Sequence, residues 1–276
     1  MDARQAYEQR VEQIDPSLER PPASAVAGRE DYGWIPFEGL ANTRDLGGLV
    51  GLDGRRVKRG LLLRSGALGY GTGADLARLR DEYHVRIVFD LRGDEETEEL
   101  PDPMDELSGA RYLHLSIIDR QTIGITQDES SRAEARALAA REEFDPSSFM
   151  AILYPHLLLE DAGVSGYGTL FRELLALEEG AALWHCTVGR DRCGMASALV
   201  EAVLGVSEDE MERDYLATNV YAPAEFSMMG GAALASFRAA RDAVTREYGG
   251  FVGYVKGALG ITEGELRELR ERYLEV

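Results

Sequence analysis

Short apolar runs recur along this chain, and segments with a helical pattern separate them. The runs that have the composition of buried strands are residues 61–64, 85–91, 112–118 and 181–184. Residues 74–83 have a helical pattern, and Met195, Leu199 and Val203 recur four positions apart, which is typical of one face of a helix. Strands that alternate with helices predict an α/β sandwich with buried parallel strands.

The segments outside these runs predict further local structure. Residues 1–30 are polar and contain Pro21-Pro22, which predicts a helix followed by an extended arm. Asp53-Gly54 lies between segments of strand-like composition and predicts a hairpin. Ser207 and Thr262 are each followed three residues later by glutamate, the pattern of a capping box that starts a helix.

A long helical segment interrupts the alternation of strands and helices. Residues 130–159 are alanine-rich and apolar, and Asp145-Pro146 divides them. The segment is too long for a simple connection. Two interpretations stay open for this insertion, at about residues 119–165: a helical lid over the functional site, or a plain packing subdomain.

Length and composition favour one globular unit. The chain has 276 residues, of which 45% are hydrophobic, and no linker divides it, so we expect one domain at residues 31–276. No apolar stretch approaches 18 residues and the N-terminus lacks a signal-peptide core, so we expect a cytoplasmic protein. Two cysteines provide no framework of structural disulfides.

The charge of the chain limits its partners. A formal net charge of −19 repels nucleic acid and anionic lipid surfaces, so we expect neither nucleic-acid binding nor stable membrane association. The acidic run at residues 95–99 is most simply a solvated helix face. The four histidines are dispersed without metal-ligand spacing, so we expect no metal and no cofactor. The oligomeric state is left open.

The segment at residues 185–194 carries the strongest chemical signal. It joins the apolar run 181–184 to the helical pattern that follows, and it sets Cys186 and Arg192 six positions apart. Between them, the backbone N–H groups from Thr187 onward can converge on one point, because Gly189 and Gly194 allow backbone shapes that a Cβ would obstruct. This arrangement predicts a site for a phosphate dianion.

The same segment predicts an ionised cysteine. A free thiol has a pKa of about 8.5, and a helix N-terminus beside arginine lowers this pKa to roughly 3.5–7.5. Cys186 is therefore a candidate nucleophile, and the planar guanidinium of Arg192 is a candidate clamp for phosphoryl oxygens. The alternative for Cys186 is that it is only a small buried hydrophobic residue. His185 is either an ordinary core histidine or a residue that fixes the loop by hydrogen bonding.

Several motifs in order resemble those of the bacterial tyrosine-phosphatase-like family, whose loop is His-Cys-x-x-Gly-Lys-Asp-Arg-Thr-Gly. The segments that carry the resemblance, besides the loop, are Asn42-Thr43-Arg44-Asp45-Leu46-Gly47-Gly48, Arg64-Ser65-Gly66, Asp90-Leu91-Arg92, Tyr167-Gly168-x-x-Phe171-Arg172 and Leu259-Gly260. The resemblance covers nearly the whole chain. The resemblance implies a cysteine-phosphatase fold, with a central, mostly parallel sheet flanked by helices.

The resemblance also implies an activity. It implies a phosphomonoesterase that forms a phosphocysteine on Cys186, with phosphate bound by Arg192. Phosphotyrosine or a similar phosphoester is the implied substrate, and a small phosphorylated metabolite such as a sugar, nucleotide or inositol phosphate is the alternative. Two further alternatives are a pseudophosphatase that binds phosphate without turnover, and sulfur transfer or arsenate reduction by the same thiolate.

The remaining site residues follow from the loop and the resemblance. The leaving group needs a proton, and Asp191 is the first candidate because the matching family residue has that role; Asp90 is the second. Either carboxylate could instead brace the loop or pair with an arginine. The candidates for binding phosphate or substrate are Thr187, Val188, Gly189, Arg190, Arg44, Arg64 and Asp90. Arg44, Arg64 and Arg92 are equally candidates for framework ion pairs.

Two residues depart from the family loop. Arg190 replaces lysine, which keeps the charge but changes a point donor into a planar fork. Cys193 replaces a threonine whose hydroxyl helps the thiolate to leave, and a thiol donates a weaker hydrogen bond, so hydrolysis of the intermediate could be slow. Cys193 is also a possible redox partner of Cys186, in a reversible disulfide that protects the nucleophile; the alternative is a tolerated small residue.

Overall fold

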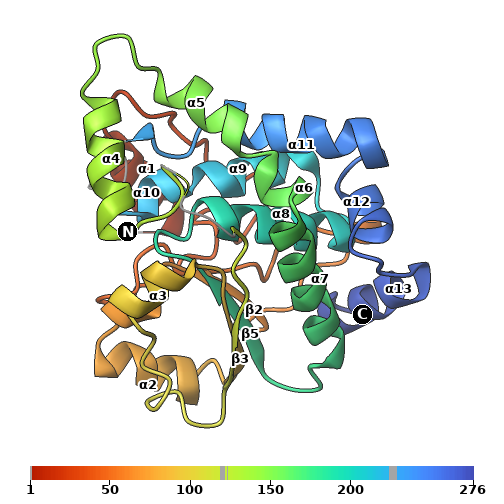
Figure 1. The fold of residues 1–276 in the computed structure, drawn as a ribbon. Helices are drawn as coiled ribbons and strands as arrows, with labels where there is room; N and C mark the ends of the chain where they lie inside the picture. The colour runs from red at the N-terminus through yellow and green to blue at the C-terminus, as the bar shows by residue number, and fades with distance from the viewer. Residues whose placement is uncertain (1, 119–121, 123, 224–228) are drawn as a thin grey trace.

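A computed structural model describes residues 2–118, 122, 124–223 and 229–276. Within this part of the chain, one five-stranded sheet has the order β1-β2-β5-β3-β4. Figure 1 labels its three central strands, β2, β5 and β3. The strands are β1 (Arg44–Asp45), β2 (Leu62–Ser65), β3 (Val85–Asp90), β4 (Arg111–His114) and β5 (Ala181–His185). β1 is antiparallel to β2, and the other neighbouring pairs are parallel, which confirms the mostly parallel sheet.

Helices cover the sheet and extend well beyond it. The α-helices are α1 (Ala3–Glu12), α2 (Gly73–Asp81), α3 (Asp94–Glu99), α4 (Glu129–Ala139), α5 (Pro146–Leu153), α6 (His156–Leu159), α7 (Asp161–Ala176), α8 (Asp191–Leu204), α9 (Glu208–Leu216), α10 (Thr218–Tyr221), α11 (Leu234–Tyr248), α12 (Phe251–Gly257) and α13 (Glu263–Tyr273). Two short 3₁₀ helices, η1 (Leu52–Gly54) and η2 (Leu68–Tyr70), lie in loops.

The two faces of the sheet contribute to separate hydrophobic clusters. Successive side chains of a strand point to opposite faces. Leu62 and Trp184 belong to the large cluster that includes residues of α7 and α8. Leu63 and Leu183 belong to a smaller cluster with residues of α2. Both faces are therefore buried, which explains why β2 and β5 are continuous apolar runs rather than alternating ones.

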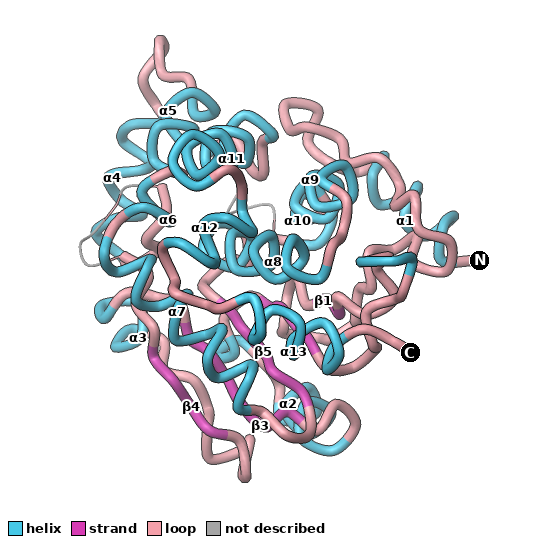
Figure 2. Tube along the Cα trace, turned by 90° about the vertical axis from the view of Figure 1, so that its right-hand side faces the viewer, coloured by secondary structure: helices cyan, strands magenta, loops and turns pink. Residues whose placement is uncertain are grey.

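Helix α8 is the central helix of the molecule. It follows β5 after the loop at residues 186–190, lies against the sheet, and carries α12 on its other side (Figure 2). Nearly every side chain along it is buried. The helix ends at Gly205, whose φ of +81° is the left-handed conformation that glycine adopts most readily. Helix α8 is therefore fixed within the large hydrophobic cluster.

Most of the predicted elements are present, with differences at their ends. β4 ends at His114, four residues before the predicted strand does. At the predicted hairpin, the chain turns through η1, and an antiparallel bridge joins Val50 to Arg56 outside the named strands. Thr262 begins α13 with the predicted capping box. Ser207 caps α9, but the Glu210 side chain does not complete the predicted capping box. Its carboxylate accepts hydrogen bonds from Ser24 and Ala25 instead.

The N-terminal segment is packed against the body of the molecule. α1 contacts α10, and the ring of Tyr7 is buried beside Tyr32 and Tyr221. The carboxylate of Glu210 accepts hydrogen bonds from the Ser24 hydroxyl and from the Ala25 N–H, the latter at 3.2 Å. Tertiary contacts thus hold the predicted arm along its length.

The helical insertion reaches the centre of the molecule. α5 and α6 pack on α11, and α6 also contacts α8 (Figure 1). The Tyr154 hydroxyl donates to Asp191 Oδ1 at 2.6 Å, at the first residue of α8. The carbonyls of Gly124 and Ile125 accept hydrogen bonds from Arg190 and Arg192. The insertion therefore contacts the loop that precedes α8, while its residues 119–121 and 123 lie outside the described part.

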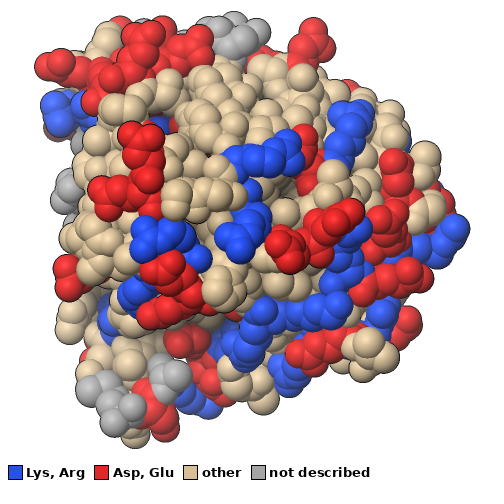
Figure 3. Space-filling model, turned by 90° about the horizontal axis from the view of Figure 1, so that it is seen from below, with Lys and Arg blue, Asp and Glu red and all other residues tan. Residues whose placement is uncertain are grey.

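Charge is spread over the surface in mixed patches. On the face seen from below, basic and acidic side chains lie next to one another over much of the lower right part, and acidic ones predominate along the upper left edge (Figure 3). Among the described residues, no helix combines the length and the apolar character that crossing a bilayer requires.

Candidate active site

The loop at residues 186–190 connects β5 to α8 and is buried, together with the start of the helix. Gly189 has a φ of +70°, and a Cβ on it would come within 2.7 Å of the Ser65 carbonyl oxygen. Only glycine fits this position, because the conformation is strained for other residues and the space is filled. The side chain of Cys186 is 1% exposed. The loop is therefore tightly packed at the N-terminus of α8, and the convergence of its N–H groups on one point stays a prediction.

The Cys186 thiol is held in a form that ionises easily. Burial alone would raise its pKa. A hydrogen bond from the Cys193 side chain, the positive charge of Arg192 and the Cys193 N–H outweigh burial and lower this pKa to about 5. This direction favours the thiolate at neutral pH, and the role of Cys186 as the nucleophile stays a prediction.

A carboxylate holds the guanidinium of Arg192. Arg192 Nη1 contacts Glu96 Oε2, and Arg192 Nη2 donates to Glu96 Oε1 at 2.9 Å. Burial opposes the charge on both partners, but the arginine lowers the pKa of Glu96 and the carboxylate raises that of Arg192. Arg192 Nε is buried and has no hydrogen-bond partner among the described residues. One donor of the clamp is thus left for another ligand.

Glu96 is a site residue that the sequence analysis missed. It lies in the acidic run interpreted as a solvated face, and its neighbours Glu95 and Glu98 are indeed exposed, whereas Glu96 is buried. Its carboxylate also accepts from the Thr187 hydroxyl and from the Gly93 N–H at 3.0 Å. No periodicity in α3 marks this residue, because its partners come from a loop about ninety residues later.

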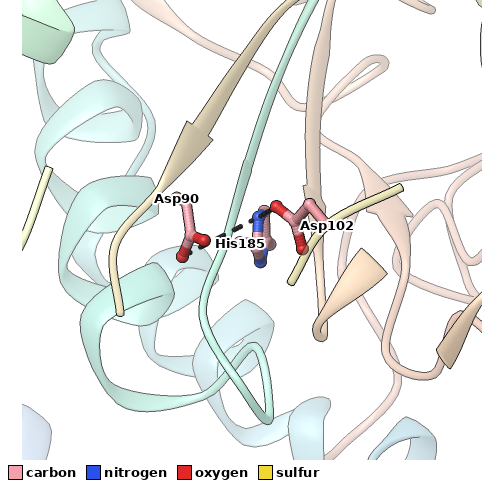
Figure 4. A group of neighbouring side chains, drawn as sticks. All are labelled: Asp90, Asp102 and His185. Carbon is pink, nitrogen blue, oxygen red and sulfur yellow. Dashed lines mark hydrogen bonds and ion pairs between the residues drawn. The ribbon is translucent and has the colours of Figure 1, made fainter. Parts of the chain in front are cut away.

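His185 joins a second buried ion-pair group behind the loop (Figure 4). His185 Nε2 lies 2.6 Å from Asp102 Oδ2 and 3.9 Å from Asp90 Oδ1. Burial alone would lower the pKa of His185, but the two carboxylates raise it above its usual value. The other ring nitrogen lies 3.3 Å from the Cys186 carbonyl oxygen. His185 therefore connects the start of the loop to β3 and to Asp102.

Asp90 is fully engaged in this group. Arg92 donates to it from Nε at 2.9 Å and from Nη2 at 2.6 Å, and the Tyr112 hydroxyl donates at 2.9 Å. Burial raises the pKa of Asp90, but the charges of His185 and Arg92 outweigh burial and lower it. These contacts fit the interpretation of Asp90 as a brace for Arg92. Arg92 is therefore part of a buried ion pair with Asp90.

The same group has the residue types of a metal site. The ligand atoms of Asp90, Asp102 and His185 lie within 4.8 Å of one another. Arg92 Nη2, however, lies 2.6 Å from Asp90 and 3.0 Å from Asp102, so a guanidinium already neutralises both carboxylates. A cation would have to bind beside this arginine. The donor set therefore fits an ion-pair network better than a metal centre.

Arg44 and Arg64 lie beneath the loop on a shared carboxylate. Arg44 Nη1 lies 3.2 Å from Asp214 Oδ1, and Arg64 Nη1 lies 2.8 Å from Asp214 Oδ2. Arg64 Nη2 also donates to the Gly189 carbonyl at 2.8 Å. Burial and neighbouring charges lower the pKa of Arg44 to about 10. Both arginines thus form ion pairs with Asp214, and Arg64 also contacts the loop directly.

Asp191 and Arg190 form a pair at the start of α8. Arg190 Nε donates to Asp191 Oδ1 at 2.9 Å, the same oxygen that accepts from the Tyr154 hydroxyl. The Tyr154 hydroxyl is in turn hydrogen bonded to that of Tyr215. The arginine pairing that was an alternative for Asp191 is therefore present. Its role as a general acid stays a prediction.

Cys193 lies on the first turn of α8, beside Cys186. Its thiol is 3.6 Å from the carbonyl oxygens of both Ser65 and Trp184, and both cysteines are free thiols. Burial and the hydrogen bond to Cys186 raise the pKa of Cys193 well above its ordinary value. Cys193 is therefore a neutral donor toward Cys186. The disulfide between the two stays a prediction.

Two cavities meet at the loop. One of about 400 Å³ is bordered by Val188 and Arg190 together with residues of α1 and α10. The other, of about 290 Å³, is bordered by Thr187 and Val188 together with residues of the β2–η2 connection. Volumes of this order suit small organic groups. The loop thus has space on both sides of Val188.

Comparisons with known proteins agree with this geometry. The sequence profile of the tyrosine phosphatase family matches residues 35–275. A Cupriavidus necator protein whose name assigns it to the tyrosine-protein phosphatases is 31% identical over 201 residues, covering 72% of this chain and 67% of that protein. A tyrosine-protein phosphatase of Nostoc commune is 23% identical over 230 residues, covering 72% of each chain.

A solved structure also aligns with the chain. The crystal structure of PTPMT1 aligns with a TM-score of 0.31 and 17% identity, over 68% of this chain and 94% of that one. The family match, in contrast, spans both the β5–α8 loop and the earlier motifs. The chain therefore belongs to the tyrosine phosphatase family, and it is a phosphatase.

Proposed function

We propose that this protein hydrolyses phosphomonoesters through a phosphocysteine on Cys186, with phosphotyrosine as its substrate. One observation carries the proposal: a cysteine with a pKa of about 5 lies in a loop at a helix N-terminus, and the Nε of a buried arginine is left without a partner beside it. The positive end of α8 and the loop N–H groups favour a phosphate dianion there. Thr187, Val188, Gly189 and Arg190 supply the backbone of this site.

The first step transfers the phosphoryl group to sulfur. The Cys186 thiolate attacks phosphorus, an S–P bond forms, and the bond from phosphorus to the ester oxygen breaks. Negative charge spreads over the equatorial oxygens, and Arg192 and the loop N–H groups are arranged to bind them. Glu96 holds the guanidinium in its plane, so Arg192 need not reorient as the charge develops.

The leaving oxygen takes a proton from Asp191 in this proposal. Asp191 is the carboxyl group nearest to the nucleophile in sequence and starts α8, and its Oδ1 is fixed by Tyr154 and Arg190. A fixed carboxyl group beside the reacting bond is what general acid catalysis requires.

The second step releases the enzyme. Water gives a proton to the Asp191 carboxylate as its oxygen attacks phosphorus, the S–P bond breaks, and phosphate leaves with the thiolate restored. The Cys193 thiol donates to the departing sulfur, as its hydrogen bond to Cys186 indicates. A thiol is a weak donor, so we expect this step to be slower than phosphoryl transfer.

Replacing the nucleophile tests the proposed reaction. Cys186→Ser should lower turnover of p-nitrophenyl phosphate and of a phosphotyrosyl peptide by at least about 10⁴-fold, while the peptide still binds. Steady-state assays measure the turnover, and titration with the peptide measures its binding. Thermal unfolding of the variant is the control for folding. Unchanged turnover would contradict the proposal. Assaying sugar, nucleotide and inositol phosphates in parallel shows whether a small phosphoester is the better substrate.

The ionisation of Cys186 can be measured directly. Because its folded-state pKa is lowered to about 5, the thiolate is present above this pH and is lost as pH falls through it. We expect the thiolate ultraviolet absorbance to titrate with a midpoint near that value in the wild type. The Cys186→Ser variant should lack the transition. A wild-type midpoint above pH 8 would show that the loop does not stabilise the anion.

Glu96 should act as a positioning residue for Arg192. Glu96→Gln removes the charge that holds the guanidinium, and we expect kcat/KM to fall about 10- to 100-fold, the equivalent of roughly 1.5–3 kcal/mol. The affinity for vanadate should fall with it, which a purely structural role would not require. The matched control is Glu98→Gln, an exposed residue of the same helix. Equal effects of the two substitutions would contradict the assignment.

The role of Asp191 shows in its dependence on the leaving group. Asp191→Asn should slow phenyl phosphate, whose leaving group needs a proton, by about 10²–10⁴-fold. p-Nitrophenyl phosphate, with a better leaving group, should be slowed much less. Tyr154→Phe is the control, because it removes a hydrogen bond to Asp191 and keeps the carboxyl group. If Asp191→Asn slowed both substrates equally, Asp191 would be a brace only.

A further inference from the structure

The larger cavity at the loop is closed on its far side by the N-terminal helix. Its volume is about 400 Å³, and it extends from the loop at residues 186–190 to α1. Among the residues that border it are Arg10, Ile14, Asp15, Val188, Asn219 and Val220. The carboxylate of Asp15 accepts hydrogen bonds from the N–H and the hydroxyl of Ser17. A group that leaves the loop by this route therefore meets the first helix of the chain.

Arg10 presents a fixed cation to this cavity. Its guanidinium carbon lies 3.5 Å from the centroid of the Trp34 ring, and Trp34 is stacked on Tyr221 with centroids 5.4 Å apart. A guanidinium that stacks by its face keeps its in-plane N–H groups for hydrogen bonds. One such bond goes to Tyr221. The aromatic pair thus orients Arg10 without neutralising it.

The charge of Arg10 is unmatched within the described structure. No carboxylate of residues 2–118, 122, 124–223 and 229–276 lies within ion-pair distance of it. Arg4, on the same helix, pairs with Glu8 at 2.9 Å. A chain with 49 acidic residues and 30 basic ones offers many partners for an exposed arginine. An oriented arginine left unpaired in a cavity beside an anion-binding loop therefore suits an anionic ligand.

We propose that this cavity is a subsite for a second anionic group of the substrate, which Arg10 binds while the phosphoryl group occupies the loop. The inference rests on the proposed phosphatase function and adds the substrate class: a phosphomonoester that carries a second carboxylate or phosphate. The organic part between the two anions lies against Ile14, Val188 and Val220, which give the cavity apolar walls.

The second anion can come from two sources. In a phosphotyrosyl peptide it is the carboxylate of a neighbouring acidic residue, and in a small phosphoester it is a second phosphate. Both present oxygens that match the N–H groups of a guanidinium. The overall charge of −19 repels such substrates at long range, so their selection depends on a local cation of this kind.

Arg10→Gln tests the subsite. The test compares two pairs of substrates. The first pair is two phosphotyrosyl peptides that differ only by Glu or Gln beside the phosphotyrosine. The second pair is inositol bisphosphate and inositol monophosphate. In the wild type the doubly anionic member of at least one pair should have the higher kcat/KM. In Arg10→Gln this preference should fall about 10-fold, the size expected of a charged hydrogen bond at a partly exposed site. The pair of substrates whose preference falls in Arg10→Gln identifies the source of the second anion.

The matched control separates this effect from loss of charge or of folding. Arg4→Gln removes the same charge from the same helix and should leave both preferences unchanged. p-Nitrophenyl phosphate, which has no second anion, should be hydrolysed equally by wild type, Arg4→Gln and Arg10→Gln. If no pair shows a preference, or if Arg4→Gln alters it as much as Arg10→Gln, the subsite is wrong and the phosphatase function stands.

A binding measurement covers the case in which the proposed function itself fails. Trp34 lies under Arg10, whereas the other tryptophan, Trp184, is fully buried in the sheet. Binding of the doubly anionic ligands should therefore change tryptophan fluorescence in the wild type and do so more weakly in Arg10→Gln. If p-nitrophenyl phosphate were not hydrolysed but this difference were seen, the phosphatase proposal would fail and the subsite would stand. Identical titrations would overturn the subsite.

Discussion

The proposed mechanism requires a negative charge on the Cys186 sulfur, which is almost fully buried, and the rest of the structure depends on that constraint. Cys186 is buried, and burial by itself opposes its ionisation. The opposing contributions are the guanidinium of Arg192, the N–H and thiol of Cys193, and the positive end of α8. Each of these has to be held in place, because a displacement of the donors would return the proton to the sulfur.

Three buried ion-pair groups hold those donors from different sides. Glu96 fixes Arg192, His185 connects the loop to Asp102 and Asp90, and Asp214 gathers the arginines beneath Gly189. Buried charges of this kind are costly when one partner is missing. Removal of one partner from any of these groups would therefore leave an uncompensated buried charge beside the loop. The insertion adds Tyr154 and the carbonyls of Gly124 and Ile125 to the same loop.

The sequence predicted the parts of this arrangement that are local in the chain. β5, the loop and α8 follow one another, so their apolar pattern, glycines and the spacing of Cys186 and Arg192 were sufficient to predict the strand, the loop and the helix and to select these two residues as candidates. Glu96 and Asp214 were not predicted, because their roles depend on partners brought together by the sheet order β1-β2-β5-β3-β4. Arg10 was hidden for the same reason: a polar N-terminal helix has no pattern that shows which cavity it closes.

The most direct test of the central claim is to look for the phosphorylated enzyme itself. Wild-type protein is mixed with p-nitrophenyl phosphate, quenched in acid during turnover, digested and analysed by mass spectrometry. The account predicts one added phosphoryl group on the peptide that contains Cys186, at a level that reflects the slow second step expected with Cys193. Steady hydrolysis with no phosphoryl group on that peptide, or with the group on another residue, would contradict it.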